Sequence, residues 1–430
     1  MLQTFKNAWK IPELKKKILF TLLIVIIYRI GANIPMPYVT NDIANLAQQS
    51  SGTIFEYLNI LSGGAFAQAT LFALGVSPYI TSSIVIQLLT IAIPAFERWS
   101  KEGEEGKKKL NMATKITTVI LALITSFGYC RLMSYYGVLP ADLTWFQELV
   151  VIMTYCAGAS IVMWIADLIK GRGIGNGVSV ILFVNIIAGS TTTIAQMIGM
   201  VNTSTIGSTI GGIALLIASV LFTLLIVVVI VILNDSERRI PIQYAKRVVG
   251  RKMYGGQGTN LPIKLNMTGV MPIIFASSIV SIPATIGQFF PNSNFWKGVT
   301  NVFNFDKPLY ILIEFLLLIA FAYFYVAISF NPVEVSNNIK QLGGAIPGIR
   351  PGKPTSDFIT RVLNRITLIG ALVLAFICIF PMIISAATGG QFASLAFGGS
   401  SVIIVVGVAL ETVREHEAQM TLRNYKGFLD

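Results

Sequence analysis

Few side chains in this chain of 430 residues could carry out chemistry. His416 is the only histidine, which excludes a site with two imidazole ligands and argues against histidine-based acid–base catalysis. Cys130, Cys156 and Cys378 stand singly among apolar residues, so they provide no disulfide framework. We therefore expect no catalytic residue, no metal site and no cofactor, and we do not expect the chain to be an enzyme.

The glycine-rich run 171–177 superficially suggests a phosphate-binding loop. It lacks the third glycine of the G-x-G-x-x-G pattern in either register, and no strand is expected before it. No P-loop pattern occurs elsewhere in the sequence. Nucleotide hydrolysis is therefore not expected of this chain.

The composition is that of a protein embedded in a membrane. Charged residues make up 12% of the chain, about half the share typical of soluble domains. Segment 173–234 contains 62 consecutive residues without Asp, Glu, Lys or Arg. A bilayer-spanning helix needs about 20 apolar residues, so this segment alone can hold two spans. The sequence predicts a polytopic integral membrane protein.

Apolar segments bounded by charge or turn residues predict ten membrane-spanning helices. They lie near 18–34, 75–93, 114–134, 148–168, 178–199, 208–233, 268–290, 309–330, 366–386 and 395–411. The first follows a basic region, 15–17, but no small-residue cleavage site comes after it, so we expect a retained span and not a signal peptide. If the N-terminus is cytoplasmic, that side receives 28 of the 32 Lys and Arg residues. The positive-inside rule then predicts that both termini are cytoplasmic.

One apolar segment is too short to span. Phe55–Leu61 would be only about 10 Å long as a helix, and Ser62, Gly63 and Gly64 end it. Such a piece is either a helix on the outer surface or a re-entrant plug buried in protein, and the pattern leaves both open.

Polar residues within the spans allow two interpretations. Ser77, Thr81, Ser82, Ser83 and Gln87 share one span, and Asn185 lies on another. Hydrogen bonds between helices are their commoner role, and a wetted opening seam is the alternative. Glu148, Asp167, Glu314 and Glu411 are expected at or near span ends, which disfavours a midplane site for ions or protons.

Two cytoplasmic connections, 234–266 and 331–365, are long, basic and rich in Gly and Pro. Charge alone is explained by the positive-inside bias. Their length allows a second interpretation, in which they form a docking surface for a cytoplasmic partner.

Several strings, in one order along the chain, resemble the SecY family of protein-translocase channel subunits. They are Tyr28–Pro37, Leu61–Ala65, Ala73–Ile80, Gly173–Gly177, Tyr244–Arg247, Asn266–Pro272 with Phe275–Ser278, and Pro347–Gly352. The resemblance implies an all-α membrane protein whose ten helices form two inverted five-helix halves, 1–200 and 201–430, around a central pore. It also implies a re-entrant plug helix near 55–66, and docking loops at 234–266 and 331–365.

The resemblance further implies roles for individual residues. A ring of aliphatic side chains would close the pore at Ile80, Ile84, Leu182, Ile186, Ile274 and Ile404, although the family often has Ile where this chain has Leu182. The plug would comprise Phe55, Tyr57, Leu58, Ile60, Leu61, Ser62, Gly63 and Gly64. Ser82, Ser83 and Gln87 would border a lateral gate. Docking of a motor or ribosome would involve Arg238, Arg239, Lys246, Arg247, Arg251, Lys252 and Arg350.

The implied function is a protein-conducting channel that translocates unfolded preproteins and releases signal sequences sideways into membrane lipid. Its partners would be SecE, SecG and either the SecA ATPase or a ribosome, in the bacterial plasma membrane. A small-solute secondary transporter is the main alternative, and it would require buried midplane charges. A receptor subunit without a pore is a second alternative. A chloroplast homologue is disfavoured because no transit-peptide-like N-terminus is seen.

Overall fold

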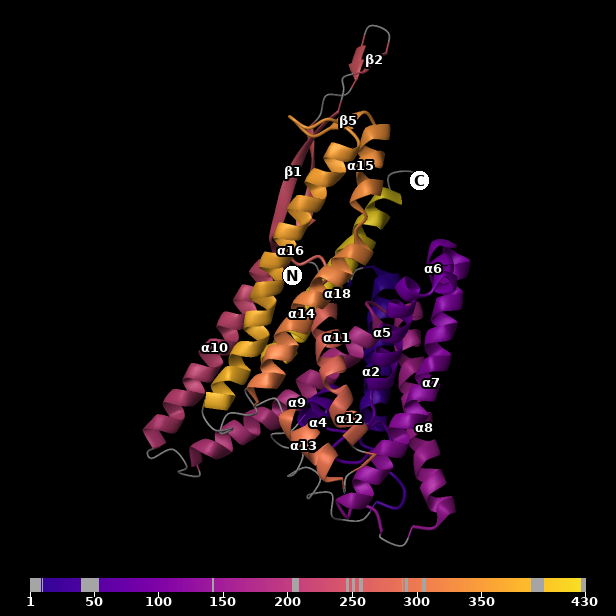
Figure 1. Cartoon of the computed structure of the whole chain (residues 1–430), viewed down its shortest axis with the longest axis vertical. Helices are drawn as coiled ribbons and strands as arrows, with labels where there is room; N and C mark the ends of the chain where they lie inside the picture. The colour runs from indigo at the N-terminus through magenta and orange to yellow at the C-terminus, as the bar shows by residue number, and fades with distance from the viewer. Residues whose placement is uncertain are drawn as a thin grey trace.

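The computed structural model is a bundle of helices that carries a small antiparallel sheet at one end (Figure 1). The residues it describes are 9, 11–39, 54–140, 143–202, 209–244, 247–249, 252–254, 258–287, 289–290, 293–303, 307–387 and 398–426.

Each of the ten predicted spans falls on a helix in the described part of the chain. The helices are α2 (Pro12–Gly31), α5 (Ser77–Ala92), α7 (Glu104–Tyr135), α8 (Trp145–Arg172), α9 (Gly177–Asn202), α10 (Thr209–Asp235), α11 (Met271–Val280) with α12 (Ile282–Gly287), α14 (Pro308–Ser329), α16 (Lys353–Ala387) and α18 (Gly398–Lys426). Among the described residues, four helices are individually long and apolar enough to cross a membrane: α7, α8, α14 and α16. Shorter apolar stretches lie within α9 (Gly177–Thr191), α10 (Val220–Asp235) and α11 with α12 (Met271–Gly287).

Proline sets several helix boundaries. It occupies the first turn of α2, α5, α11 and α14, where its missing N–H has no intrahelical partner in any case. At Ile93 the chain leaves α5 and turns by 100° into α6 (Pro94–Lys101). α8 begins with a capping box formed by Thr144 and Gln147.

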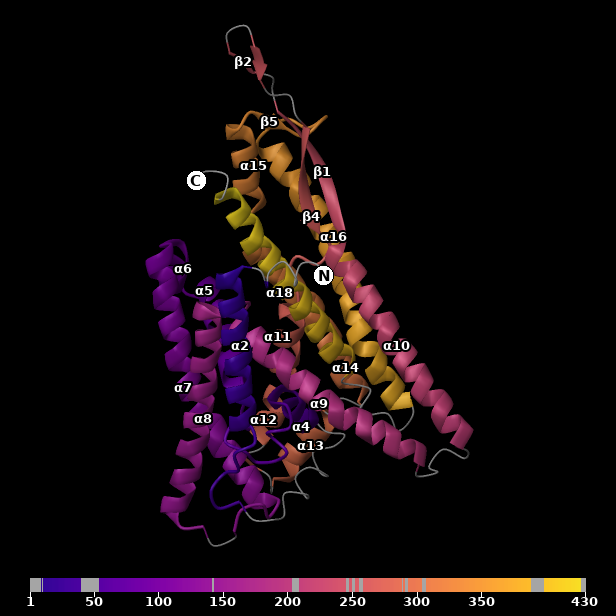
Figure 2. The same cartoon turned by 180° about the vertical axis from the view of Figure 1, so that it is seen from behind.

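The helices form two groups that meet at the centre of the molecule. α2, α5, α7 and α8 lie together on one side, and α10, α14, α16 and α18 lie on the other (Figures 1 and 2). α9 packs against α8 and also against α10 and α18, whereas α11 packs against α14 and α5. α9 and α11 therefore join the two groups. The inverted-repeat relation between 1–200 and 201–430 stays a prediction.

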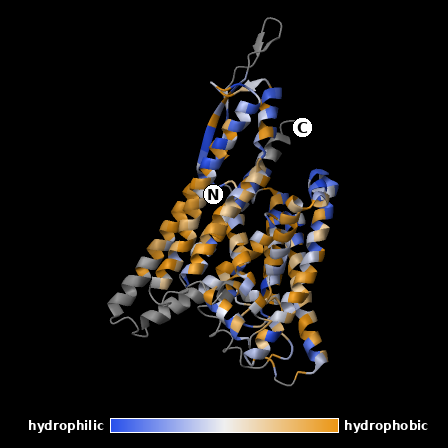
Figure 3. Cartoon of the chain, viewed as in Figure 1, coloured by the Kyte–Doolittle hydropathy of each residue, from blue (hydrophilic) through white to orange (hydrophobic). Residues whose placement is uncertain are grey.

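Apolar residues predominate in the spanning part of the bundle, and hydrophilic residues gather at α6, α15 (Pro332–Gln341) and the strands (Figure 3). The largest buried cluster draws side chains from both helix groups, so the core crosses the plane where they meet. A second cluster around Tyr129, Met133 and Tyr155 fixes the segment between α4 (Ile54–Ser62) and α5 onto α7 and α8.

The sheet adds strands to a fold predicted from sequence as all-helical. β1 (Glu237–Tyr244) pairs antiparallel with β4 (Gly258–Lys264) on one edge and with β5 (Gly344–Ala345) on the other. β2 (Arg247–Val249) and β3 (Lys252–Tyr254) form a separate hairpin between β1 and β4. The helical prediction is correct for the spans, and the strands lie in the long connections between them.

Candidate functional site

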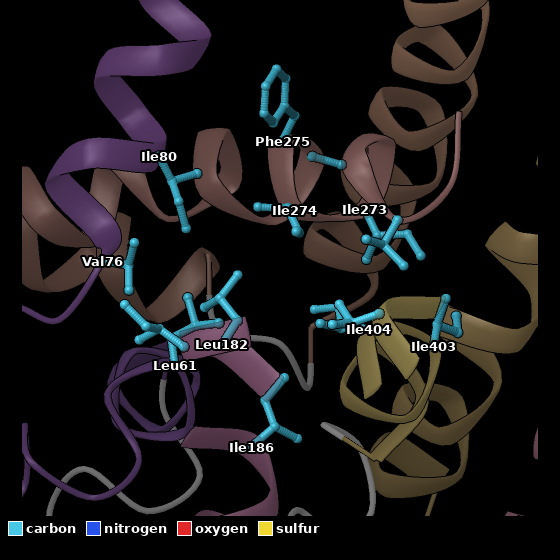
Figure 4. Packing of buried hydrophobic residues seen from close by; sticks show 14 of the residues in the cluster. Leu61, Val76, Ile80, Leu182, Ile186, Ile273, Ile274, Phe275, Ile403 and Ile404 are labelled. Carbon is cyan, nitrogen blue, oxygen red and sulfur yellow. The ribbon is translucent and has the colours of Figure 1, made fainter. Parts of the chain in front are cut away.

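The six aliphatic residues predicted to form a ring lie together at the centre of the bundle. α5 supplies Ile80 and Ile84, α9 supplies Leu182 and Ile186, α11 supplies Ile274, and α18 supplies Ile404. Each side chain is 4% exposed or less, and all six belong to one buried cluster. Figure 4 shows five of them converging from the four helices on one region. We call these six residues the ring.

The chemistry of the ring is that of a seal. Branched apolar side chains that meet at a constriction exclude water, and a hydrophobic constriction blocks ions by dewetting. The ring side chains offer no hydrogen-bonding group, so they have no specific attraction for a polar ligand. The role of the ring as the closed part of a pore stays a prediction.

The short apolar segment forms a helix, α4, beside the ring. Leu61 is buried and lies near Val76, Ile80 and Leu182 (Figure 4). Leu58 and Ile60 are half-buried, and α4 packs against α9. The backbone of Phe55 and Tyr57 is helical, but their side chains lie outside the described residues. The described C-terminal part of α4 is therefore packed inside the protein, as one of the two interpretations of the sequence requires.

Polar contacts fix the end of α4, and sequence reasoning did not identify them as a group. Asn185 donates hydrogen bonds to the Tyr28 hydroxyl and to the Leu61 carbonyl, both at 2.8 Å. Arg29 Nη1 lies 3.4 Å from the Gly63 carbonyl. The sequence offered two signals, the charged Arg29 and the amide Asn185, each in an otherwise apolar span. A polar group that is buried there needs a hydrogen-bond partner.

A seam runs between α5 and α7 on one side and α14 with the joining helices α11 and α12 on the other. The Tyr325 hydroxyl of α14 donates to Gln87 Oε1 of α5 at 2.8 Å, and Gln87 Nε2 lies 3.5 Å from Ser83 Oγ. Near the opposite end of the seam, the Phe127 and Phe289 rings stack with centroids 6.0 Å apart. A hydrogen bond near one end of the seam and an aromatic contact near the other end therefore both link its two sides.

Ser82 differs from the other two residues predicted to border the gate. Its hydroxyl is buried and donates to the Thr114 carbonyl of α7 at 2.7 Å, so it joins two helices of the same group. Ser82 lies one residue before Ser83, and adjacent residues project from different faces of a helix. The structure therefore places Ser83 and Gln87 at the seam, and Ser82 away from it.

A cavity of about 260 Å³ lies beside the seam. Its lining includes Leu61 of α4, Thr81 of α5, Leu121 of α7 and Ile282 of α12. The cavity is mostly apolar, and it is bounded by α4 and by helices from both groups. It therefore adjoins both α4 and the seam.

One buried carboxylate differs from its predicted position. Glu314 was expected near a span end, but it lies about two turns inside α14 and is only 1% exposed. Ser277 Oγ of α11 donates to Glu314 Oε1 at 3.0 Å, and the Cys378 thiol of α16 lies 3.9 Å from the same oxygen. The carboxyl group of α14 therefore contacts α11 and α16 and connects the three helices. Among the described residues, no group of three or more His, Cys, Asp or Glu side chains is placed to hold a metal ion.

The two predicted docking loops form one structural unit. β5 of the second loop pairs with β1 of the first, with Gln243 opposite Ala345. Ile240, Ile263, Ile339 and Ile359 form part of the buried core beneath. We call β1, β4, β5 and α15 the sheet extension. The two loops were predicted separately, because nothing in the sequence pairs a two-residue strand with a distant partner.

Three of the predicted docking residues have side chains that the structure places on this extension or beside it. Arg238, Arg239 and Arg350 are exposed, and Arg239 forms an ion pair with Glu237 at 2.7 Å. Arg247 and Lys252 lie in the β2–β3 hairpin, where only the backbone is described, and Lys246 and Arg251 lie outside the described residues.

The SecY family model matches residues 70–413 of the chain. The protein translocase subunit SecY of Streptomyces galbus is 42% identical over 446 residues, covering 100% of both chains. The protein translocase subunit SecY of Thermus thermophilus is 41% identical over 440 residues, covering 100% of this chain and 98% of the relative.

Solved structures share the fold at lower identity. The structure of a protein conducting channel aligns with a TM-score of 0.64 and 19% identity, over 94% of this chain and 92% of that chain. Sec61 in the canine ribosome–channel complex from the endoplasmic reticulum aligns with a TM-score of 0.61 and 16% identity, over the same 94% and 92%.

Proposed function

The chain belongs to the SecY family of protein translocase subunits, and we propose that its ring and α4 are the closed gate and the plug of a protein-conducting channel. The observation that carries this proposal is the ring itself. Six aliphatic side chains from both helix groups meet at the centre of the bundle, with α4 packed beside them. The relatives are translocase subunits, so a small-solute transporter is no longer the alternative to consider.

An aliphatic ring suits the transport of an extended polypeptide. It offers no hydrogen bond to a passing peptide group, so no particular sequence adheres to it. Apolar contacts are non-directional, so the seal adapts to side chains of different sizes. With the chain absent, the ring closes and excludes water and ions.

The seam provides a route into lipid. Parting of α5 and α7 from α11 and α14 would break the Tyr325–Gln87 hydrogen bond and expose the apolar cavity beside α4. An apolar signal sequence could then leave the channel sideways, while the hydrophilic part of the preprotein continues through the ring. Gln87 and Ser83 are the gate residues in this proposal, and Ser82 anchors α5 to α7.

Cytoplasmic partners would dock on the sheet extension. Arg238, Arg239 and Arg350 present exposed positive charge, which suits a polyanion such as ribosomal RNA. One structural neighbour is a channel bound to the ribosome, which supports a ribosome as a partner. We also propose the SecA ATPase as an alternative motor and SecE and SecG as membrane partners. The channel itself would catalyse no reaction, because the motor supplies ATP hydrolysis.

The chain is a multi-pass membrane protein, and we place it in the bacterial plasma membrane. The curated relatives quoted above are bacterial. With 28 of 32 basic residues assigned to the side of the sheet extension, the positive-inside rule places both termini in the cytoplasm.

Disulfide capture of a stalled preprotein tests the channel directly. Cys130, Cys156 and Cys378 are replaced by serine, and Ile274→Cys is introduced in the ring. The variant is reconstituted with SecE and SecA, and a preprotein that carries one cysteine is stalled part-way by a bulky fold. A polypeptide inside the ring is expected to be captured at position 274 only when ATP is present.

The matched control is Leu316→Cys on α14, whose side chain is 57% exposed on the outside of the bundle. Capture at 274 and not at 316 would support the proposed pore. Translocation without capture at 274 would contradict it, and would leave a subunit without a pore as the better interpretation.

A further inference from the structure

The C-terminal end of α4 is held by side chains of two other helices. Asn185 of α9 donates to the Leu61 carbonyl at 2.8 Å, and Arg29 of α2 approaches the Gly63 carbonyl at 3.4 Å. The last carbonyls of a helix have no intrahelical partner and carry partial negative charge. An amide N–H and a guanidinium are therefore the complementary groups for this end of α4.

The Asn185 side chain is itself fixed. It is completely buried, and its amide also donates to the Tyr28 hydroxyl at 2.8 Å. Tyr28 stacks on Phe72 with ring centroids 5.5 Å apart. Both amide hydrogens of Asn185 are thus used, and its direction toward α4 is set by α2.

Gly63 fits this contact because it has no side chain. A Cβ atom at position 63 would lie 2.7 Å from Arg29 Nη1 and 2.8 Å from Asn185 Oδ1, which is closer than atoms can pack. Gly64 follows with a positive φ of 91°, but a Cβ there would meet nothing within 4 Å. Gly63 also has a positive φ, 68°, so both glycines lie in the region that favours glycine, and only Gly63 is in close contact with other side chains.

The segment after these glycines is anchored separately. The Tyr129 hydroxyl of α7 donates to the Phe66 carbonyl, and the Tyr155 hydroxyl of α8 lies 3.5 Å from the Ala69 carbonyl. α4 continues into this segment through Gly63 and Gly64, and two hydrogen bonds also tie them together, because Phe66 N–H donates to Ser62 Oγ and Ala67 N–H donates to Asn59 Oδ1, both at 2.9 Å. Release of the contacts at Leu61 and Gly63 would therefore remove the polar contacts that hold this end of α4 to α9 and α2.

We propose that Asn185 and Arg29 are positioning residues that form a polar latch on α4 and hold the plug in the closed channel. The proposal rests on the proposed function, in which α4 is the plug. Asn185 directly precedes Ile186 of the ring, so a shift of α9 that opens the ring also pulls Asn185 from Leu61. The ring and the plug are thereby coupled through one helix.

The test measures the position of α4 directly. Ser62→Cys is introduced in the variant without native cysteines, and labelling by a membrane-impermeant maleimide is timed in vesicles reconstituted with SecE. Ser62 is 2% exposed, so labelling is expected to be slow while the latch is intact. Asn185→Leu keeps the approximate volume and removes the donor, and we expect labelling roughly tenfold faster. Arg29→Gln is expected to act in the same direction but less strongly, because its contact is longer.

A second pair of variants breaks the latch from the side of the plug. Gly63→Ala forces a methyl group against Arg29 and Asn185 and should also accelerate labelling. Gly64→Ala imposes comparable backbone strain without a contact, so it should label at nearly the parent rate. The double variant with Asn185→Leu and Gly63→Ala should label no faster than the faster single variant, because both changes break the same contact.

Asn266→Leu controls for the general cost of removing a buried amide. Asn266 donates a hydrogen bond to Asn234 at 2.8 Å, and both residues are far from α4 in the sequence. Equal labelling of Asn185→Leu and Asn266→Leu, or of Gly63→Ala and Gly64→Ala, would overturn the latch. Ile274→Cys capture is measured on the same preparations. If Ile274→Cys captures no preprotein while the labelling rates at position 62 differ as expected, the channel would be rejected and the latch retained.

Discussion

In the proposed channel, the ring residues make a seal because their side chains have no hydrogen-bonding groups. Isoleucine and leucine carry no donor or acceptor, so water within the constriction would lose hydrogen bonds without replacement. By contrast, two buried polar residues nearby bond to other helices: Asn185 donates to the Leu61 carbonyl, and Ser277 donates to Glu314. At the residue scale, polar groups hold helices together and the ring stays free of them.

A polar side chain placed in the ring should therefore open a path for water. We expect Ile404→Asn to increase the resting ion conductance of reconstituted bilayers at least tenfold, because an amide wets the constriction. Ile404 is nearly fully buried, so Ile404→Leu, which conserves volume, serves as the control and should remain close to the parent. Equal conductance of the asparagine and leucine variants would show that the ring does not make the seal.

Contacts across the seam operate at the scale of elements. The Tyr325–Gln87 hydrogen bond joins α14 to α5 across 238 residues of sequence. α14 also carries Tyr323, whose hydroxyl donates to the Asn364 carbonyl of α16 at 3.1 Å, within one helix group. The two tyrosines therefore offer the same chemical group on one helix, with only one of them linking the two groups.

Tyr325→Phe should make the seam easier to open. Loss of one hydrogen bond of about 1 kcal/mol favours the open state roughly fivefold, so a preprotein with a less hydrophobic signal sequence should be exported more efficiently. Tyr323→Phe should leave export of the same preprotein near the parent level, although it removes an equivalent hydroxyl. Export that rises equally in both variants would assign the effect to α14 packing and not to the seam.

The same elements show what the sequence could and could not predict. All ten spans were predicted, because long uncharged segments have few alternatives in a membrane protein. The shortness of segment 55–61 predicted a helix that does not span and left a surface helix and a buried plug both open, whereas the plug and the ring residues came from the family resemblance. The partners of Gln87, Asn185 and Arg29 could not be predicted, since each lies on a distant helix whose rotation depends on tertiary packing. The contact of Ser82 with α7 could not be predicted for the same reason, and the pairing of β5 with β1 had no local signal.

The whole molecule is polar at one end and apolar through its middle (Figure 3). The sheet extension, the end of α18 and α6 rise at the same end of the bundle (Figure 1). Most basic residues of the sequence belong to that end, whereas Arg131, Lys297 and Lys307 belong to the connections at the other. By the positive-inside rule this asymmetry agrees with the proposed orientation in the membrane, and it gives the proposed docking surface its positive charge.

If the sheet extension binds a polyanion, its affinity must depend on salt in proportion to the charges it contributes. Among the described ion pairs, Arg239 is joined to Glu237 and none involves Arg238, so Arg238 is the better charge to remove. We expect Arg238→Gln to weaken ribosome binding and to reduce the slope of log affinity against log salt by roughly 0.9, the value for one phosphate contact on duplex DNA. Thermal unfolding should not change, because the Arg238 side chain is exposed. Lys307→Gln removes the same charge from the opposite end of the bundle and should leave the slope unaltered. A slope that falls equally in both variants would mean that net charge, and not the sheet extension, governs the interaction.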